Sequence, residues 1–426
     1  MKITIPGRFA LALAGVLSIA LYCPAQDSLR IKLPEAEKQF MDKNLALMAE
    51  KYNISMARAQ VIQARLYSNP NVQVAASAWN PDQKKVLDIS NQTGEYTVGL
   101  QQLITLAGKR NRQIKLAETN TELAENRFYD LVRTLHYTLR SDFFQAYYLQ
   151  RAIAAYQVQI AALEKLTANY NELQQKGVIT LKETVRVKSL LYSLQAEQTG
   201  LQNQYNDTEA ELQQLLQNNH TWFIPVSDPA GNNLPSVRQF PLTTLIDSAY
   251  SNRADLKLAA NNLAYSQQNY SLQKALAVPD LTAGAQFDKR GSFVTNASFL
   301  TLAMDLPFFN RNQGNIKAGK IAIDQSEVQL VQQRQTVENE VQLAYKKALN
   351  TEKMLGSIDK NFQADLDKLL QSITENFEKR NLSLLEFTDF YDSYKQNMLQ
   401  WNQLQNDRIQ AIESLNFSIG KPIVNY

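Results

Sequence analysis

The stretch Tyr96–Arg110, with the sequence YTVGLQQLITLAGKR, joins the two kinds of element that we predict for the chain. Apolar and polar or small residues alternate from Tyr96 to Gln101, which is the period of a β-strand. The segment Ala107–Lys176 then contains no proline, and its only glycine is Gly108 near the start. A helix of roughly 70 residues is on the order of 100 Å long, far longer than a helix of a globular domain. The stretch therefore predicts a strand that leads directly into a rod-like helix.

The predicted long helix and the segment after Gly177 carry apolar residues at spacings of three and four. Such spacing keeps one apolar seam facing a partner helix, as in a coiled coil. The pattern by itself is equally typical of a soluble antiparallel coiled coil with a structural role. The seam consists of Ile153, Tyr156, Ile160, Leu163, Leu166, Tyr170 and Leu173 before the turn, and of Leu194, Leu201, Tyr205, Thr208, Leu212 and Leu215 after it.

Three further segments alternate in the same way, at residues 72–78, 281–287 and 299–306. One apolar and one polar face over about ten residues is typical of a transmembrane β-strand. It is also typical of a half-buried strand in a soluble sheet. Four strands are too few to close a barrel, which needs about eight. If these strands lie in a membrane, the chain therefore needs copies of itself, and three copies would supply twelve strands.

The chain follows one plan twice, with an offset of roughly 200 residues. Each copy of the plan has a shorter helix, two strands and a long helical hairpin. In the second copy the long helix begins near Gly314, turns near Arg380-Asn381 and returns to about Ile419. Asn44–Leu47 in the first shorter helix is echoed by Asp255–Leu258 in the second. The predicted divisions are a signal peptide (1–25), a first repeat (26–217, with its shorter helix at Pro34–Leu66), a linker (218–241) and a second repeat (242–426, with its shorter helix at Leu242–Ala277).

The N-terminus has the pattern of an export signal. Lys2 and Arg8 are followed by an apolar run to Tyr22 that is shorter than the about 20 residues needed to span a bilayer. We expect cleavage after Ala25. The alternative is a lipid-modified Cys23, although the residue before such a cysteine is normally small. If cleavage follows Ala25, the only cysteine leaves with the signal peptide.

Composition and motifs argue against several classes of function. The 44 basic and 41 acidic residues give a net charge of +3, which does not favour nucleic acid as a partner. His136 and His220 lack a metal-ligand spacing with another histidine or cysteine, and we find no motif for phosphate binding or nucleophilic catalysis. For Met41, Met48 and Met56, core packing is favoured over a thioether path for metal ions. We therefore expect no catalytic residue, metal site or cofactor.

Three stretches carry a resemblance to a known family. They are Leu66–Asn71 (LYSNPN), Gln102–Arg110 (QLITLAGKR) and Asp305–Gly314 (DLPFFNRNQG). With them, residues 33–420 resemble the TolC-like outer membrane factor family. The third stretch is similar to the corresponding passage of the heavy-metal branch, which contains the cobalt-zinc-cadmium and copper-silver exporters.

The resemblance implies a mainly α fold with a small β part. Three copies would form an α-barrel of long antiparallel coiled-coil helices in the periplasm and a 12-stranded β-barrel in the outer-membrane lipid. The partners would be a periplasmic adaptor (membrane fusion) protein and an inner-membrane pump of the resistance-nodulation-division or a similar class. The channel would be a passive duct for metal cations or drugs and not an enzyme. The alternatives are a type I protein-secretion duct of the same family and a periplasmic structural or adaptor coiled-coil protein.

In the family, the hairpin tips form the periplasmic mouth and the edge that docks the adaptor. Gly177 suits the left-handed conformation that a tight turn requires, and Asn381 is the next best residue type for it. Aliphatic residues at the tips would either contact the adaptor or pack the turn itself. The matching residues here are Gly177, Val178, Ile179, Thr180 and Leu181, and Asn381, Leu382, Ser383 and Leu384.

Acidic residues follow each tip. Glu386 and Asp389 are three residues apart and therefore share a helix face, and Glu183 stands near the matching place after the first tip. They resemble the acidic rings at the mouth of family members. Threefold symmetry would turn each into a ring of carboxylates that attracts cations. The alternative is that they are ordinary solvated charges of a helix surface.

Overall fold

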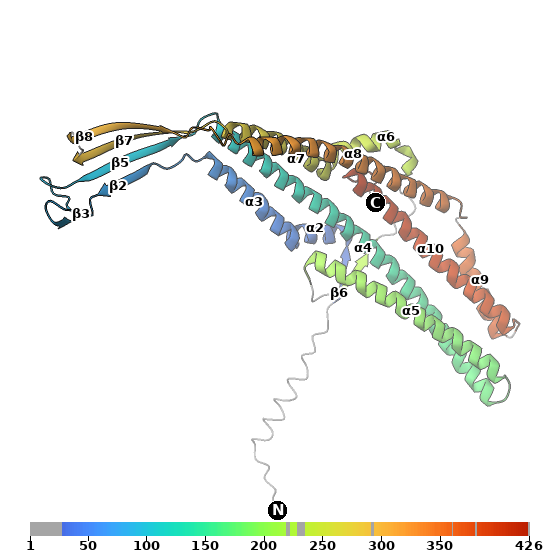
Figure 1. Cartoon of the computed structure of the whole chain (residues 1–426). Helices are drawn as coiled ribbons and strands as arrows, with labels where there is room; N and C mark the ends of the chain where they lie inside the picture. The colour runs from blue at the N-terminus through green and yellow to red at the C-terminus, as the bar shows by residue number, and fades with distance from the viewer. Residues whose placement is uncertain are drawn as a thin grey trace, which may run out of the picture. The chain divides into compact units, whose positions relative to one another are not determined.

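The computed structural model describes residues 28–218, 222–227, 235–290, 294–359, 361–379 and 381–424. The predicted signal peptide, Cys23 and His220 lie outside these residues. The chain forms two compact units, which we describe separately. Unit 1 comprises Met1–Leu45, Arg133–Ile246 and Glu340–Tyr426, and unit 2 comprises Ala46–Val132 and Asp247–Asn339. Each unit draws on both predicted repeats, because the helices α4 (Lys109–Gln175) and α8 (Gln313–Gly356) contribute residues to both units (Figure 1).

The long helices lie close to where periodicity places them. The helix α4 spans Lys109–Gln175 and has 67 residues. The returning helix α5 spans Leu181–Leu216, and the last helix, α10, spans Leu384–Ile419. The predicted seam is confirmed in unit 1, since most of its members are buried, among them Ile153, Tyr156, Ile160, Leu163, Leu194, Tyr205, Leu212 and Leu215.

Each predicted shorter helix is in fact two helices. The first is broken at Asn44, between α2 (Leu33–Lys43) and α3 (Leu45–Arg65). The Asn44 side chain donates to the carbonyl oxygen of Leu215 at 3.0 Å, a long-range contact that local sequence does not reveal. The second is broken at Arg253, between α6 (Leu242–Asn252) and α7 (Ala254–Leu276). Asn44 therefore corresponds to Arg253, and the predicted match of Asn44 to Asp255 is wrong by two positions.

The second long helix is also interrupted. The helix α8 spans Gln313–Gly356, and α9 (Phe362–Glu378) begins after a break. Gly356 favours this end because glycine is a weak helix former. The Asp359 side chain then accepts the backbone N–H of Asn361 at 2.9 Å, so it stabilises the connection to α9. The uninterrupted helix predicted from Gly314 to the turn is therefore wrong at this point.

Unit 2 contains a four-stranded antiparallel sheet in the order β2-β5-β7-β8 (Figure 1). The strands are Asn71–Ala76, Tyr96–Ile104, Leu281–Arg290 and Thr295–Met304. The register pairs apolar residues with apolar residues: Val72 faces Leu100, Leu100 faces Ala285, and Ala285 faces Leu300. Because directly paired residues share a face, the predicted alternation produces one continuous apolar face. That face is open to solvent, with Leu300 91% exposed.

The predicted linker contains more structure than its composition indicates. The strand β6 (Trp222–Val226) pairs in parallel with β1 (Ser28–Lys32), and the 3-10 helix η2 spans Val237–Gln239. The buried carboxylate of Glu209 accepts the backbone N–H of Phe223 at 2.8 Å and so holds β6 against α5. In unit 2, a second two-stranded sheet is a short hairpin that pairs β3 (Trp79–Asn80) with β4 (Lys85–Val86).

Candidate functional site

The first hairpin tip is a glycine-dependent turn. Gly177 has φ +70°, the left-handed conformation that residues with a Cβ rarely adopt. Its N–H donates to the carbonyl oxygen of Gln174 at 3.0 Å, and the N–H of Val178 donates to that of Leu173 at 2.9 Å. These are the two hydrogen bonds of a Schellman helix end, so α4 stops where Gly177 allows the chain to reverse.

Glu183 belongs to the cap of the next helix. Its carboxylate accepts the N–H of Thr180 at 2.8 Å, and the Thr180 hydroxyl accepts the N–H of Glu183 at 3.4 Å. This reciprocal pair is a capping box, which satisfies donors that the first turn of a helix leaves free. The hydrogen bonds from the backbone and hydroxyl of Thr180 hold the pKa of Glu183 below its usual value.

The second tip has the same cap. Glu386 accepts the N–H of Ser383 at 2.9 Å, and the Ser383 hydroxyl accepts the N–H of Glu386 at 3.2 Å. Hydrogen bonds from the hydroxyl and backbone of Ser383 likewise lower the pKa of Glu386. Both caps can be read from the sequence as Thr-x-x-Glu and Ser-x-x-Glu, a motif that identifies these glutamates as helix caps.

The hydrogen bonds shift the expected correspondence between Gly177 and Asn381 by one residue. The N–H of Asn381 donates to the carbonyl oxygen of Asn376 at 2.9 Å, over the same separation as from Val178 to Leu173. Asn381 therefore corresponds to Val178. The residue that corresponds to Gly177 is Arg380, which lies outside the described residues.

The aliphatic residues of the tips divide into two groups. Leu382 and Leu384 pack against the core of the hairpins. Val178, Leu181 and Leu385 are instead exposed by 52, 64 and 62%. Ile179 is half-buried. Leu382 and Leu384 therefore pack the hairpins, whereas Val178, Leu181 and Leu385 leave apolar area uncovered.

Asp389 is the acid that remains free of the caps. It is exposed and three residues beyond Glu386. Its equivalent after the first tip is Arg186, which donates to the Thr388 hydroxyl at 3.4 Å. The structure thus places a cation and an anion at matching positions of the two tips. The hydrogen bond from Arg186 to Thr388 connects the first tip to the second.

A stack of aromatic rings supports the second tip in unit 1. The ring of Phe377 lies 4.1 Å from that of Phe387 and 6.0 Å from that of Tyr170. Tyr391 continues the stack at 5.6 Å from Phe387. The rings come from α4, α9 and α10, so they pack the two hairpins together just behind the turns.

A polar link lies deeper between the hairpins. Glu197 of α5 accepts a hydrogen bond from the Tyr156 hydroxyl at 2.8 Å and one from Lys395 of α10 at 3.0 Å. Burial alone would raise the pKa of Glu197, but the hydrogen bonds from Tyr156 and Lys395 outweigh it and lower that pKa.

A second polar cluster, which the sequence did not reveal, joins three helices of unit 1. Arg140 of α4 pairs with Glu37 of α2 at 2.5 Å and with Glu413 of α10 at 2.8 Å. His136 lies 3.1 Å from Glu37. Burial raises the pKa of Glu413, although Arg140 opposes that shift. The cluster joins α2, α4 and α10, which are distant in sequence, so no local pattern could have found it.

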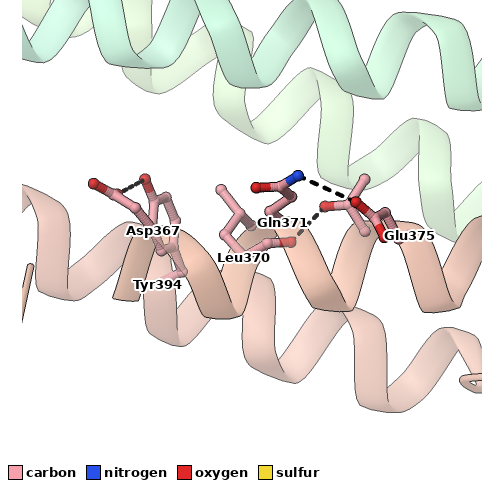
Figure 2. A pocket seen from close by; sticks show the side chains of 6 residues that line it. Asp367, Leu370, Gln371, Glu375 and Tyr394 are labelled. Carbon is pink, nitrogen blue, oxygen red and sulfur yellow. Dashed lines mark hydrogen bonds between the residues drawn. The ribbon is translucent and has the colours of Figure 1, made fainter. Parts of the chain in front are cut away.

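Figure 2 shows a shallow depression of about 300 Å³ between α9 and α10. Its polar groups bind one another: the Tyr394 hydroxyl donates to Asp367 at 3.1 Å, and Gln371 donates to Glu375 at 3.2 Å. Burial, followed by the nearby Asp367, raises the pKa of Tyr394 to about 12. Because these groups are already paired, we assign no ligand to the depression. Its lining consists of Asp367, Leu370, Gln371, Thr374, Glu375 and Tyr394.

Within the described ranges, no cluster of three or more histidine, cysteine or acidic side chains has an arrangement that could hold a metal ion.

The predicted core packing of three methionines is wrong for the single chain. Met41, Met48 and Met56 are exposed by 40, 40 and 58%.

Long helical hairpins and an antiparallel sheet that exposes an apolar face are the elements of the predicted fold class. A family model described as outer membrane efflux protein matches residues 38–218 and 245–421. The chain belongs to this family. The predicted fold class and the outer-membrane location are thereby confirmed, and the chain is an efflux protein of the outer membrane. None of the described helices combines the length and the apolar character needed to cross a membrane.

Individual relatives agree with this assignment. The cobalt-zinc-cadmium resistance protein CzcC of Cupriavidus metallidurans is 20% identical over 387 residues, which cover 89% of this chain and 87% of the relative. A membrane protein from Pseudomonas aeruginosa has a similar fold, with a TM-score of 0.74 at 15% identity and 93% of each chain covered. The channel protein CusC gives a TM-score of 0.72 at 16% identity, with 91% of this chain and 92% of CusC covered.

Proposed function

We propose that three copies of this chain form a passive duct that exports small solutes, coupled through a periplasmic adaptor to an inner-membrane pump. Metal cations are the favoured cargo, because CzcC is named for resistance to cobalt, zinc and cadmium. The periplasmic adaptor and soluble coiled-coil alternatives are set aside, because the outer membrane efflux model matches both halves of the chain.

The observation that carries the proposal is the four-stranded sheet. Most of its large apolar side chains lie on one face, although Leu103 and Phe299 lie on the other. Within the described part of the chain, the outer strands β2 and β8 each have one partner. An exposed edge with an apolar face invites pairing with another strand. Pairing β8 of one copy with β2 of the next would remove every edge once the ring closes, and its apolar face would then contact lipid.

The exposed residues of the tips support adaptor docking. Val178, Leu181 and Leu385 offer apolar area that the hairpins themselves leave uncovered. Apolar side chains exposed together are typical of a contact with another protein. Glu183 and Glu386 shape the tips through their caps, and Asp389 is the remaining candidate for a ring of charge at the mouth.

Deletion of the gene, followed by growth in cobalt, zinc, cadmium and common drugs, tests the export of small solutes. We expect increased sensitivity that the wild-type chain reverses. Unchanged tolerance combined with the loss of a secreted protein would overturn the proposal in favour of a protein-secretion duct.

A tip variant tests the docking. Leu181→Asp with Leu385→Asp should abolish both the resistance and the cross-linking of the chain to its adaptor, while channel formation in planar bilayers is retained. The control is Val158→Asp, at a position of α4 that is 73% exposed and lies away from the tips. Full resistance in the double variant would remove the tips from the docking site.

A further inference from the structure

The two repeats connect their strands by segments of different length. Residues 77–95 separate β2 from β5, whereas only residues 291–294 separate β7 from β8. Antiparallel strands can be joined by a few residues, so the sheet does not require the longer connection. This connection contains β3 and β4 and lies at the end of the sheet away from α3 (Figure 1). We call residues 77–95 the β3–β4 segment.

A buried carboxylate holds the β3–β4 segment in one conformation. Asp88 is 4% exposed, and it accepts hydrogen bonds from the Ser90 and Thr93 hydroxyls, both at 2.7 Å. The Asn80 amide also donates to Asp88, at 3.1 Å. The Asn80 oxygen in turn accepts the N–H of Asp82 at 3.1 Å, at the turn that follows β3. The polar groups of the segment therefore bind one another.

A close backbone approach fixes the other end of the segment. The N–H of Gly94 donates to the carbonyl oxygen of Ser90 at 2.9 Å. A Cβ at Gly94 would lie 2.5 Å from backbone atoms of Ile89 and Ser90, so only glycine fits here. The segment is therefore a preorganised element of the fold.

The outer surface of the β3–β4 segment is apolar. Trp79 pairs with Val86 across the two strands, so their side chains share a face, and they are 52 and 69% exposed. Asn80 follows Trp79 and lies on the opposite face, with the polar cluster. Leu87 and Ile89 are also exposed, by 62 and 68%. The segment thus turns polar groups inward and apolar side chains outward, the reverse of a loop that faces only water.

Leu87 adopts a backbone conformation that disfavours leucine. Its φ is +49°, in the left-handed region, where a bulky residue is an outlier and glycine or asparagine is normal. The N–H of Leu87 donates to the carbonyl oxygen of Ala78 at 3.2 Å, which fixes the position next to β3. In water, the exposed leucine side chain offsets none of this strain. An apolar medium that covers it would offset the strain through the hydrophobic effect.

The surroundings of the segment indicate which medium covers it. The chain is an outer-membrane protein, and β2 leads directly into the segment with Val74 66% exposed on the apolar face of the sheet. A tryptophan such as Trp79 favours the boundary between acyl chains and headgroups. The turn carries Lys84 and Lys85 against one acid, Asp82, and all three are exposed. A net positive turn beside an apolar surface is complementary to phosphorylated lipid headgroups.

We propose that the β3–β4 segment is a lipid anchor that lies in the headgroup layer of the outer leaflet. Trp79, Val86 and Leu87 enter the upper part of the acyl region, and Lys84 and Lys85 contact lipid phosphates. The inference rests on the proposed lipid contact of the sheet and extends it beyond the strands. Each copy carries one anchor, because residues 291–294 of the second repeat are too few for another such hairpin.

Depth-dependent quenching tests the anchor. A fluorophore that senses polarity is attached to Val86→Cys, Leu300→Cys or Gln92→Cys, each in a chain with Cys23→Ala, in vesicles of phosphatidylethanolamine and phosphatidylglycerol. Lipid with a nitroxide near the headgroup should quench the label at residue 86 most strongly. A nitroxide near the chain end should favour residue 300, which is 91% exposed in the middle of β8. Iodide in the water should quench residue 92, the exposed polar control within the same segment.

The label on the strand separates the two proposals. Lipid quenching at residue 300 together with iodide quenching at residue 86 would overturn the anchor and leave the duct standing. Protection of residue 86 from both lipid nitroxides and iodide would mean that protein covers the segment, and this too would overturn the anchor. Failure of lipid nitroxides to quench either label would overturn the lipid contact of the sheet as well.

Trp79 provides a second measurement without a label. In a chain with Trp222→Phe and Trp401→Phe, lipid brominated near the headgroup should quench the emission of Trp79. The matched control keeps Trp401 of α10 as its single tryptophan, and its emission should not respond. Adding Lys84→Gln and Lys85→Gln should weaken the quenching of Trp79 in vesicles that contain phosphatidylglycerol. Equal responses of Trp79 and Trp401 would overturn the anchor, and quenching that does not change without the two lysines would overturn their contact with phosphate.

Discussion

The two hairpin tips share a backbone design and differ in their side chains. Each begins its second helix with the same capping box, at Thr180–Glu183 and at Ser383–Glu386. Behind the caps, a buried Thr184 in the first tip corresponds to a buried Phe387 in the second, and Arg186 corresponds to Asp389. The helix cap is therefore common to both tips, whereas the packing behind it and the surface charge differ.

The aromatic stack is the largest difference between the tips. Phe387 is 2% exposed and stacks on Phe377, so Phe387→Ala should lower the free energy of unfolding by about 3–5 kcal/mol. Thr184→Ala, at the equivalent buried position, should cost only about 1 kcal/mol. Urea unfolding of the detergent-purified protein measures both. Equal losses would show that the stack does not stabilise the second tip more than Thr184 stabilises the first.

The turn of the first tip depends on the left-handed conformation of Gly177. Gly177→Ala should destabilise the first tip by about 1 kcal/mol, because its φ of +70° strains a residue with a Cβ even though no atom lies within 4 Å. Gly200 lies inside α5 with equal space around it. There, Gly200→Ala should stabilise the protein by about 0.5–1 kcal/mol, because alanine favours a helix. Thermal unfolding of the two variants should show shifts of opposite sign, and shifts of the same sign would contradict a left-handed turn.

The sequence was informative where a feature repeats along the chain. The apolar spacing located α4 and α5, and alternation located the strands, because both patterns result from periodic burial. The internal repeat located α10. The breaks at Asn44 and after Gly356 depend on single residues and distant partners, so periodicity passed over them. The cluster around Arg140 depends wholly on tertiary packing. The first turn was predictable from Gly177, and the second from the internal repeat of the chain. The role of Glu183 and Glu386 as helix caps became clear only from their hydrogen bonds in the structure.

The shared caps make the tips sensitive to acid. The pKa values of Glu183 and Glu386 are lowered from the usual 4.5, so the stabilisation they provide is present above pH 4.5 and is lost as pH falls through the lowered values. A variant with Glu183→Gln and Glu386→Gln keeps the hydrogen-bonding shape of the caps without the charge. Its thermal midpoint should therefore change less between pH 6 and pH 3 than that of the wild type. Identical pH profiles would mean that these carboxylates do not contribute through their charge.

The smallest expected effect concerns the charges outside the caps. In the proposed trimer, Arg186 and Asp389 would alternate around the mouth. Removing the positive charge and removing the negative charge should therefore shift the ion selectivity in opposite directions. Asp389→Asn should lower the preference for cations in planar-bilayer recordings, and Arg186→Gln should raise it. Each change should stay within about fivefold, since an exposed charge contributes up to about 1 kcal/mol. Both changes should fade at 1 M salt, where the Debye length is about 3 Å.

Asp389 is a better probe of the mouth than Glu386, because replacing Glu386 also removes a helix cap and would mix a change of charge with a change of structure. Selectivity that does not respond to either variant would mean that these two charges do not face the path of the ions.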